Sequence, residues 1–267
     1  MCATCGCGQD EVRISWTSQE GGTTYSPLGH DHGPDHGHEH GTDTHHGHSH
    51  HHEHEGPHTV DIEQAVLARN DHLAGHNRAA LQDRRITAVN LMSSPGAGKT
   101  SLLERTIREH HKEICVIEGD QETRFDADRI RDAGARAVQV NTGAGCHLDA
   151  TMVAGALERL EPSPGSLVFV ENVGNLVCPA LFDLGENRRV VIISVTEGDD
   201  KPLKYPHMFA AADLVVVNKT DLLPYVDFDL ARCAADARKL NRDLDVIPLS
   251  VKSGENLDGW YAWLDGI

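Results

Sequence analysis

The sequence lacks long apolar runs. No apolar stretch reaches about eighteen residues, the length that a membrane-spanning helix requires, so we expect no membrane partner. The first residues contain no apolar core of the kind found in secretion signals, which makes the cytoplasm the expected compartment. Basic residues are also scarce, because 24 Lys and Arg face 41 Asp and Glu for a formal net charge of −17. No basic stripe is present to displace counterions, so we expect no nucleic-acid partner.

The chain divides into three parts by composition. Residues 1–58 have almost no apolar periodicity and are rich in Gly, His, Asp and Thr, which predicts a disordered, Cys/His-rich metal-binding segment. Apolar residues recur at helical spacing in the next part and predict a leading helix over residues 59–84. In residues 85–267 apolar, mostly β-branched runs alternate with helical stretches, which predicts a nucleotide-binding α/β domain with a mostly parallel, doubly wound sheet. The runs are residues 86–92, 114–117, 137–140, 167–170, 190–195, 213–217 and 246–250.

The first apolar run leads into a Gly-rich loop, SSPGAGKTS, at residues 93–101. A strand, such a loop and a helix in this order predict a P-loop NTPase, in which backbone N–H groups surround phosphate. We expect Lys99 to contact the β- and γ-phosphates and the Thr100 hydroxyl to bind magnesium. Ser93 stands where the usual pattern has its first glycine. The expected nucleotide contacts in this loop are Gly96, Ala97, Gly98, Lys99, Thr100 and Ser101.

A second motif, NKTD, follows the run at residues 213–217 and concerns the base. The Asp221 carboxylate is placed to accept from N1–H and the 2-amino group of guanine, whereas adenine would leave the buried charge unpaired at a cost of roughly 2–3 kcal/mol. Asn218 is expected to tie this loop to the phosphate side, and Lys219 to lie along the base. The sequence therefore predicts a GTP site. A further loop resembles the accessory loop on the guanine side and adds Ser250, Val251 and Lys252.

Three groups of residues suggest metal binding, and the first is at the start of the chain. Cys2, Cys5 and Cys7 bring three thiols together, with the terminal amine as a possible fourth ligand. Soft thiolates with an amine suit nickel(II) in a planar site or zinc in a tetrahedral one. Because the chain shows no secretion signal, its seven cysteines favour thiol or metal chemistry over disulfides.

The second group is a histidine run. Thirteen of the 19 histidines lie between His30 and His58, interleaved with acidic residues and glycines. Most imidazoles are neutral at pH 7 and free to bind metal. We interpret this run as storage or buffering of a borderline metal, and the affinity order alone does not select nickel over copper or zinc.

The third group lies in the predicted domain. Cys146 and His147 follow one strand through a Gly-rich loop, and Cys178 follows another strand. Both loops should leave the same edge of a parallel sheet, where ligands bind in such folds. Three ligands leave one coordination position of a tetrahedral ion open, and a second subunit could supply the fourth ligand. Cys115 and Cys233 fall inside a strand and a helical stretch, and we expect them to be packing residues.

Catalytic assignments rest on few residues. We assign Lys99 to phosphate charge, Thr100 to magnesium and Asp120 to holding magnesium through water. Asp126 is a weaker candidate that is equally suited to capping a helix. The segment from Glu171 to Gly174 occupies the place of a γ-phosphate sensor, with Glu where many GTPases have Asp. No catalytic arginine or glutamine is assigned, so slow intrinsic turnover is expected.

Several segments together resemble one family, the hydrogenase nickel-incorporation GTPases (HypB). The similarity covers the phosphate loop, GCHLD at 145–149, ENVGNLVCP at 171–179 and EGDDKPLKYP at 197–206, and extends from about residue 60 to the C-terminus. Cys2, Cys5 and Cys7 match the amino-terminal nickel motif of this family, in which Ser93 is also usual. Lys204 resembles a family lysine that reaches across a dimer toward the partner's nucleotide site.

The resemblance implies a GTPase that forms homodimers with GTP and metal. It also implies a role in loading nickel into the large subunit of nickel–iron hydrogenase, together with a zinc-bearing metallochaperone partner. Three alternatives are a urease accessory GTPase, a zinc-transferring GTPase and a nickel-storage protein with a vestigial nucleotide site. The cysteine-rich terminus and the Cys178 loop disfavour the first, and the lack of a Cys-x-Cys-Cys motif disfavours the second. Intact Lys99, Thr100 and Asp221 disfavour the third.

Overall fold

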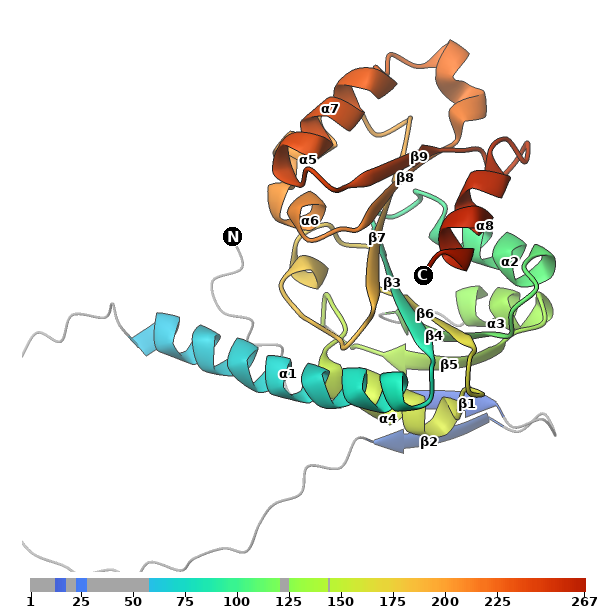
Figure 1. Ribbon diagram of the computed structural model, residues 1–267. Coiled ribbons are helices and arrows are strands. Elements are labelled where there is room, and N and C mark those ends of the chain that lie inside the picture. Colours follow the sequence, from blue (N-terminus) through green and yellow to red (C-terminus); the bar gives the residue numbers. More distant parts are fainter. Residues whose placement is uncertain (1–12, 18–22, 28–57, 121–124, 144) are drawn as a thin grey trace, which may run out of the picture.

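The computed structural model describes residues 13–17, 23–27, 58–120, 125–143 and 145–267 (Figure 1). The strands are β1 (Arg13–Thr17), β2 (Thr23–Pro27), β3 (Thr87–Ser93), β4 (Ile114–Asp120), β5 (Arg136–Asn141), β6 (Leu167–Glu171), β7 (Arg188–Ser194), β8 (Leu214–Asn218) and β9 (Asp245–Pro248). They form one sheet in the order β2-β1-β5-β4-β6-β3-β7-β8-β9. The seven strands from β5 to β9 in this order are parallel, which confirms the predicted α/β fold class.

Helices cover both faces of this sheet (Figure 1). They are α1 (His58–Asp83), α2 (Lys99–Glu109), α3 (Phe125–Asp132), α4 (Ala150–Leu160), α5 (Lys201–Lys204), α6 (Pro206–Ala210), α7 (Leu230–Leu240) and α8 (Leu257–Asp265), with short 3₁₀ turns η1 (Cys178–Ala180) and η2 (Thr220–Tyr225). The central strand β3 is buried at six of its seven positions, because a parallel sheet covered on both faces needs apolar residues on both.

Three apolar cores fill the space between sheet and helices. One core lies under α2, α3 and α8 and includes Leu91 and Trp260. Two cores lie on the other face, one under α1 and α4 and one under α6 and α7; they include Ile117 and Ile193 respectively. Successive strand residues alternate between the faces, so Leu91 and its neighbour Met92 enter different cores.

Two strands near the N-terminus were not predicted. Residues 1–58 were expected to be disordered, yet β1 and β2 within them form an antiparallel pair, and β1 also pairs antiparallel with β5. Without β1, β5 would be the edge of the parallel sheet, with unpaired backbone N–H and C=O groups. Ile14, Trp16 and Tyr25 are typical of strands, but these segments are only five residues long and lie within a Gly- and His-rich region, so composition favoured disorder. The rest of the 1–58 prediction lies outside the described residues.

The leading helix α1 runs from His58 to Asp83, and only part of its buried face is apolar. Among its described side chains, at residues 64–83, those buried are Asn70, Ala74, Asn77 and Leu81, whereas Val66 is 52% exposed. Two of the four buried positions are therefore asparagines. Hydropathy alone counts asparagines as polar surface residues, so the apolar pattern identifies only Ala74 and Leu81 of this buried face.

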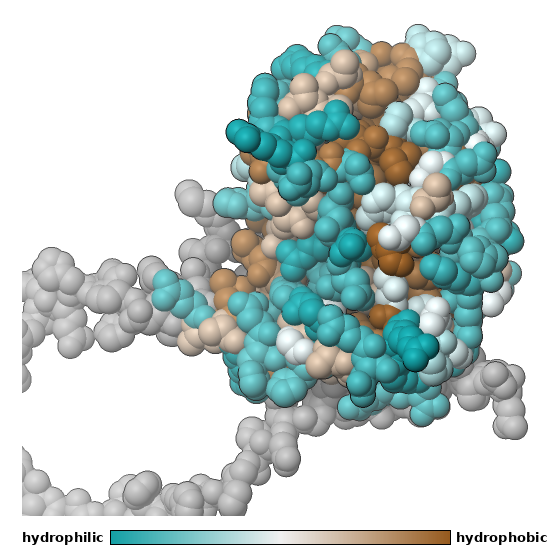
Figure 2. All heavy atoms as spheres, viewed as in Figure 1, coloured by the Kyte–Doolittle hydropathy of each residue, from teal (hydrophilic) through white to brown (hydrophobic). Residues whose placement is uncertain are grey.

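The outer surface is mostly hydrophilic in the view of Figure 2, with apolar patches between the polar residues. Among the described residues, no helix is both long enough and apolar enough to cross a membrane. Cys115 and Cys233 are buried in the cores, as predicted for packing residues.

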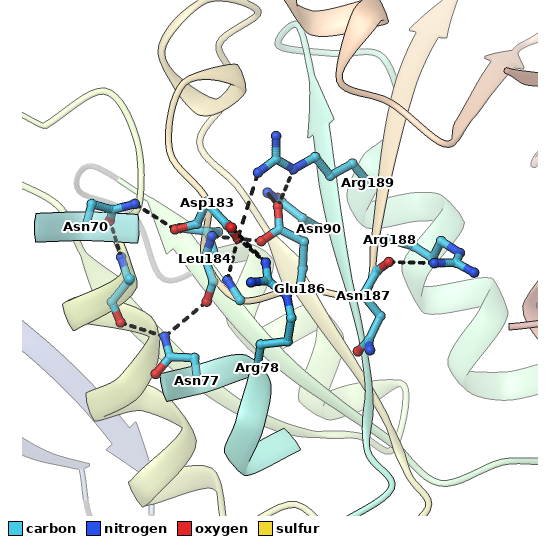
Figure 3. A network of polar contacts seen from close by, with 12 residues as sticks. Asn70, Asn77, Arg78, Asn90, Asp183, Leu184, Glu186, Asn187, Arg188 and Arg189 are labelled. Atoms are coloured by element: carbon cyan, nitrogen blue, oxygen red, sulfur yellow. Dashed lines mark hydrogen bonds and ion pairs between the residues drawn. The ribbon is translucent and has the colours of Figure 1, made fainter. Parts of the chain in front are cut away.

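Polar side chains attach α1 to the domain (Figure 3). Asn70 donates to the Asp183 carbonyl at 2.7 Å and accepts from the Ala150 N–H at 2.9 Å. Asn77 donates to the carbonyls of Ala150 and Leu184 at 2.8 and 3.0 Å. Both asparagines thus hold the first residue of α4, which begins just after the Cys146–His147 loop.

Replacing Asn77 should weaken this attachment. Asn77→Ala leaves two buried carbonyl contacts unmade, so we expect a loss of about 1–3 kcal/mol in the free energy of unfolding. Urea unfolding of the two proteins measures this difference. Gln82→Ala, at an exposed position of the same helix, is the matched control and should change stability by less than about 0.5 kcal/mol. Equal effects of the two substitutions would contradict the role given to Asn77.

Candidate functional site

The Gly-rich loop between β3 and α2 curls in the way that phosphate binding requires. Gly96 and Gly98 have φ angles of +76° and +102°, a region that residues with a Cβ rarely adopt. A Cβ at Gly98 would also lie 2.3 Å from Nδ2 of Asn218, at the end of β8. The loop is therefore held tightly against the strand that leads into the NKTD motif.

Two ammonium groups lie at this loop. Lys99 Nζ donates to Ser93 Oγ at 2.9 Å, and Lys219 Nζ donates to the Gly96 carbonyl at 2.7 Å. Ser93, which departs from the usual glycine, thus positions the lysine that we expect to contact phosphate. The next loop residue, Ser94, donates to the carboxylate of Glu197, which also forms an ion pair with Lys201.

Buried carboxylates line the other side of the loop. Thr100 Oγ1 donates to Glu171 Oε1 at 2.7 Å, and Glu171 pairs in register with Glu118 on the neighbouring strand. Both glutamates are buried, and the Oε2 atom of each has no hydrogen-bond partner among the described residues. Burial, together with the charges of Glu171 and Asp120, raises the pKa of Glu118 to about 9. Burial also raises the pKa of Glu171, against the opposing effect of Lys99.

These oxygens suit a magnesium ion. Unsatisfied carboxylate oxygens beside a threonine hydroxyl form the hard, oxygen-only ligand set that Mg²⁺ prefers. A bound cation would also relieve the cost of burying Glu171 and Glu118 as anions. Asp120 ends β4 beside them and is half-buried. Asp126 forms an ion pair with Arg129 at 3.0 Å. Sequence reasoning missed Glu118, although an acidic residue inside an apolar strand was a signal.

The predicted base-binding residues come together from β8 and from the loop after β9. Ser250 Oγ donates to Asp221 Oδ1 at 2.6 Å, which orients the carboxylate. Asn218 Oδ1 accepts from the Val251 N–H at 3.2 Å, while its Nδ2 donates to the Ala97 carbonyl at 2.9 Å. The structure thus joins the NKTD motif, the accessory loop and the phosphate loop. Ser101 lies in the first turn of α2 and Lys252 in the loop after β9, and their nucleotide roles stay predictions.

The internal cysteines and histidine also meet. The Sγ atoms of Cys146 and Cys178 lie 2.9 Å apart, and His147 Nδ1 lies 3.6 Å from Cys146 Sγ. The ligand atoms of these three residues all lie within 4.8 Å of one another. The Phe182 ring stacks on His147 with 3.9 Å between centroids, a contact that sequence reasoning missed. Burial lowers the pKa of His147, which keeps the imidazole neutral and able to bind metal.

One loop connects the candidate metal ligands to the phosphate loop. Asn172 Oδ1 accepts from the backbone N–H groups of Leu148 and Val173 at 3.3 and 3.0 Å. A Cβ on Gly174 would lie 3.1 Å from Pro95 Cγ, so the backbone passes close to the phosphate loop. The segment 171–178 therefore contacts the Cys146 loop on one side and Pro95 on the other.

Other predicted residues are placed as follows. Lys204 pairs with Asp200 of its own chain at 2.7 Å, and its reach toward a partner subunit stays a prediction. Cys2, Cys5 and Cys7 lie outside the described residues, as does the histidine run up to residue 57.

Comparison with known proteins agrees with this geometry. The domain family described as CobW/HypB/UreG, nucleotide-binding domain, matches residues 87–248. "Hydrogenase maturation factor HypB" of Escherichia coli strain K12 is 45% identical over 99% of this chain and 98% of the relative. The protein of the same name from Azotobacter chroococcum mcd 1 is 58% identical over 77% of this chain and 68% of its own length. The chain belongs to the HypB family of hydrogenase maturation factors.

A solved HypB structure has the same fold. The crystal structure of HypB from Helicobacter pylori in complex with nickel superposes with a TM-score of 0.71 at 38% sequence identity, covering 73% of this chain and 93% of that one. The family match covers β3 to β9 and thus includes the phosphate loop, both internal metal loops and the NKTD motif. The resemblance inferred from the sequence motifs is confirmed.

The buried Glu118 predicts a pH effect on stability. Its pKa of about 9 lies above the ordinary 4.5, so between these values the folded chain holds a proton that the unfolded chain has lost. Stability from this group is therefore complete below about pH 4.5 and is lost as the pH rises toward 9, by up to about 1.4 kcal/mol per pH unit. Gln has no proton to lose, so the stability advantage of Glu118→Gln over the parent should grow with pH.

Urea unfolding between about pH 6 and 8.5, without magnesium or nucleotide, measures this trend. Glu158→Gln, an exposed position on α4, is the control and should leave the pH dependence unchanged. A pH dependence of Glu118→Gln parallel to that of the parent would show that Glu118 is not the group responsible.

Proposed function

We propose that this chain hydrolyses GTP and uses its nucleotide state to control a nickel-carrying site, and so helps to insert nickel into the large-subunit precursor of nickel–iron hydrogenase. Family membership supports the role in hydrogenase maturation. The observation that carries the coupling is the close passage of Gly174 along Pro95, in a segment that ends at the metal ligand Cys178. A change at the phosphate loop can therefore reach the metal ligands through one short segment.

The phosphate chemistry is assigned to the loop and its acidic neighbours. Lys99 holds positive charge beside the β- and γ-phosphates, where negative charge shifts during transfer to water. Thr100 and Glu171 would hold magnesium, with Asp120 acting through water; when bound, this ion neutralises charge on the phosphate oxygens. The products are GDP and phosphate. Turnover is expected to be slow, since no arginine or glutamine is assigned to the attacking water.

The cargo is assigned to Cys146, His147 and Cys178. Two thiols and a neutral imidazole suit nickel(II) and also zinc, which we treat as a competing ion. Three ligands leave room for a fourth from a second subunit or a partner. In this proposal the Cys2, Cys5 and Cys7 motif is a separate nickel site, and the histidine run is a buffer.

Exposed apolar side chains beside the metal ligands support a partner-binding role. Val177 and Leu181 flank the Cys178 turn and are 55% and 52% exposed. Apolar residues exposed together are typical of protein interfaces. We propose that this region contacts a second copy of the chain in a GTP- and metal-dependent homodimer, and that a zinc-bearing metallochaperone and the hydrogenase precursor are further partners.

The base preference can be tested at Asp221. Asp221→Asn should weaken binding of GTP and GDP by about a hundredfold, since an amide presents a donor where guanine also donates. Xanthine has a carbonyl there, so xanthine nucleotides should bind the variant better than guanine nucleotides do. Titration calorimetry measures these affinities. Asp243→Asn, an exposed site with the same charge change, is the control. Equal affinity of the parent for ATP and GTP would overturn the assignment.

Coupling between the sites can be tested through nucleotide affinity. Nickel should change the ratio of affinities for GDP and a non-hydrolysable GTP analogue by about five- to a hundredfold, because binding linkage is reciprocal. Cys146→Ala and Cys178→Ala should abolish this dependence, whereas Cys2→Ala should preserve it. Measuring nucleotide affinity in the full chain avoids counting ions bound elsewhere. An affinity ratio unaffected by nickel would show that the internal site is structural.

A further inference from the structure

A second group of metal-ligating side chains lies apart from the nucleotide and cysteine sites. His110 and His111 directly follow α2, and Asp265 is the last residue of α8. The two helices lie beside each other, and Trp260 of α8 donates to Thr106 of α2 at 2.9 Å (Figure 1). Asp265 Oδ1 lies 3.2 Å from Nε2 of His110 and 3.8 Å from Nε2 of His111.

We propose that His110, His111 and Asp265 bind a borderline divalent cation, zinc or nickel, at the junction of α2 and α8. All three ligand atoms lie within 4.8 Å of one another. A tetrahedral ion with ligands at about 2.0–2.1 Å separates its ligand atoms by roughly 3.3 Å, which is close to the two distances to Asp265 Oδ1. Two imidazoles and one carboxylate are a common ligand set for such ions.

The surroundings favour a cation at this place. The C-terminal ends of α2 and α8 meet here, and each helix end carries partial negative charge on its last carbonyl groups. Glu109, at the end of α2, is already paired with Arg105 and accepts from Tyr261 Oη. Lys112 opposes cation binding, but its ammonium is on a flexible side chain that can turn toward water.

The ligands are partly fixed before any ion binds. The His110 side chain is only 1% exposed, and its ring lies near those of His111 and Tyr261, at centroid distances of 4.7 and 6.0 Å. His110 Nδ1 accepts from the Lys112 N–H at 3.3 Å. Metal binding at Nε2 moves the ring proton to Nδ1 and gives up this long hydrogen bond, without net release of a proton.

A cation here would join the P-loop helix to the last helix. α2 begins at Lys99, and its Arg105 donates to the Val251 carbonyl in the accessory loop at 2.6 Å. Fixing the far end of α2 against α8 would therefore stiffen the packing that supports this loop. The site does not depend on the proposed GTP or nickel functions, and its test requires neither.

Chemical footprinting of the full chain tests the site residue by residue. The His111 side chain is 70% exposed, so diethyl pyrocarbonate should modify it, and mass spectrometry should locate the modification. Buffered free Zn²⁺ or Ni²⁺, in separate arms, should protect His111, and EDTA should reverse the protection. Setting the free ion concentration with a metal buffer removes the effect of ions bound by other histidines.

A pair of matched variants makes the result decisive. Asp265→Asn should raise the metal concentration for half-protection at least about tenfold, the loss that even outer-sphere changes produce at metal sites. Asp258→Asn, with the same charge change on an exposed position of α8, should leave it unchanged. Circular dichroism confirms that both variants fold. Absence of protection in both arms would overturn the proposal, as would equal protection in Asp265→Asn.

Discussion

The side-chain amide of Asn218 holds together three loops that are distant in sequence. Its Nδ2 donates to the Ala97 carbonyl of the phosphate loop, and its Oδ1 accepts from the backbone N–H groups of Lys219 and Val251. The same amide closes the space in which a Cβ at Gly98 would otherwise lie. One buried amide therefore sets the distance between the phosphate loop and the expected base-binding loops of the candidate nucleotide site. A side chain without both a donor and an acceptor would lose the hydrogen bond to Ala97 or those to Lys219 and Val251. Because the position is buried, water could not replace the lost bonds.

The second constraint is the buried pair of glutamates on β4 and β6. Two buried carboxylates in register on neighbouring strands are costly as anions, and burial raises the pKa of each. The unpaired Oε2 atoms mean that this cost is not repaid within the described part of the chain. Such an arrangement is typical of functional sites, where a bound ligand offsets the cost of burying charged groups. The strand that carries Glu171 continues into the segment with Asn172, Gly174 and Cys178. One stretch of backbone therefore carries both a buried carboxylate at the phosphate loop and a candidate metal ligand.

Much of this arrangement could be predicted from local patterns. Apolar β-branched runs predict the parallel strands, and the glycine spacing with Lys99 and Thr100 predicts the phosphate loop. The rule that ligands gather at the carboxyl ends of parallel strands predicts that Cys146, His147 and Cys178 lie close together. The features that the sequence did not predict depend on contacts between segments that are distant in the chain. β1 and β2 form because β5 offers an unpaired edge, and backbone hydrogen bonds carry no side-chain signature. The inner face of α1 includes two asparagines whose partners, such as the carbonyls of Ala150 and Leu184, lie far away in the sequence.

The two candidate metal centres differ in their ligand atoms and therefore favour different ions. The oxygen atoms around Thr100 are hard ligands in a buried, highly acidic environment, which favours magnesium with phosphate. Cys146 and Cys178 are soft ligands, and the neutral His147 under Phe182 completes a set that magnesium avoids and that nickel or zinc prefers. The two centres can therefore lie on one sheet edge without exchanging ions. In the proposed function, the two centres are therefore coupled mechanically, through the backbone of residues 171–178, rather than through competition for a shared metal.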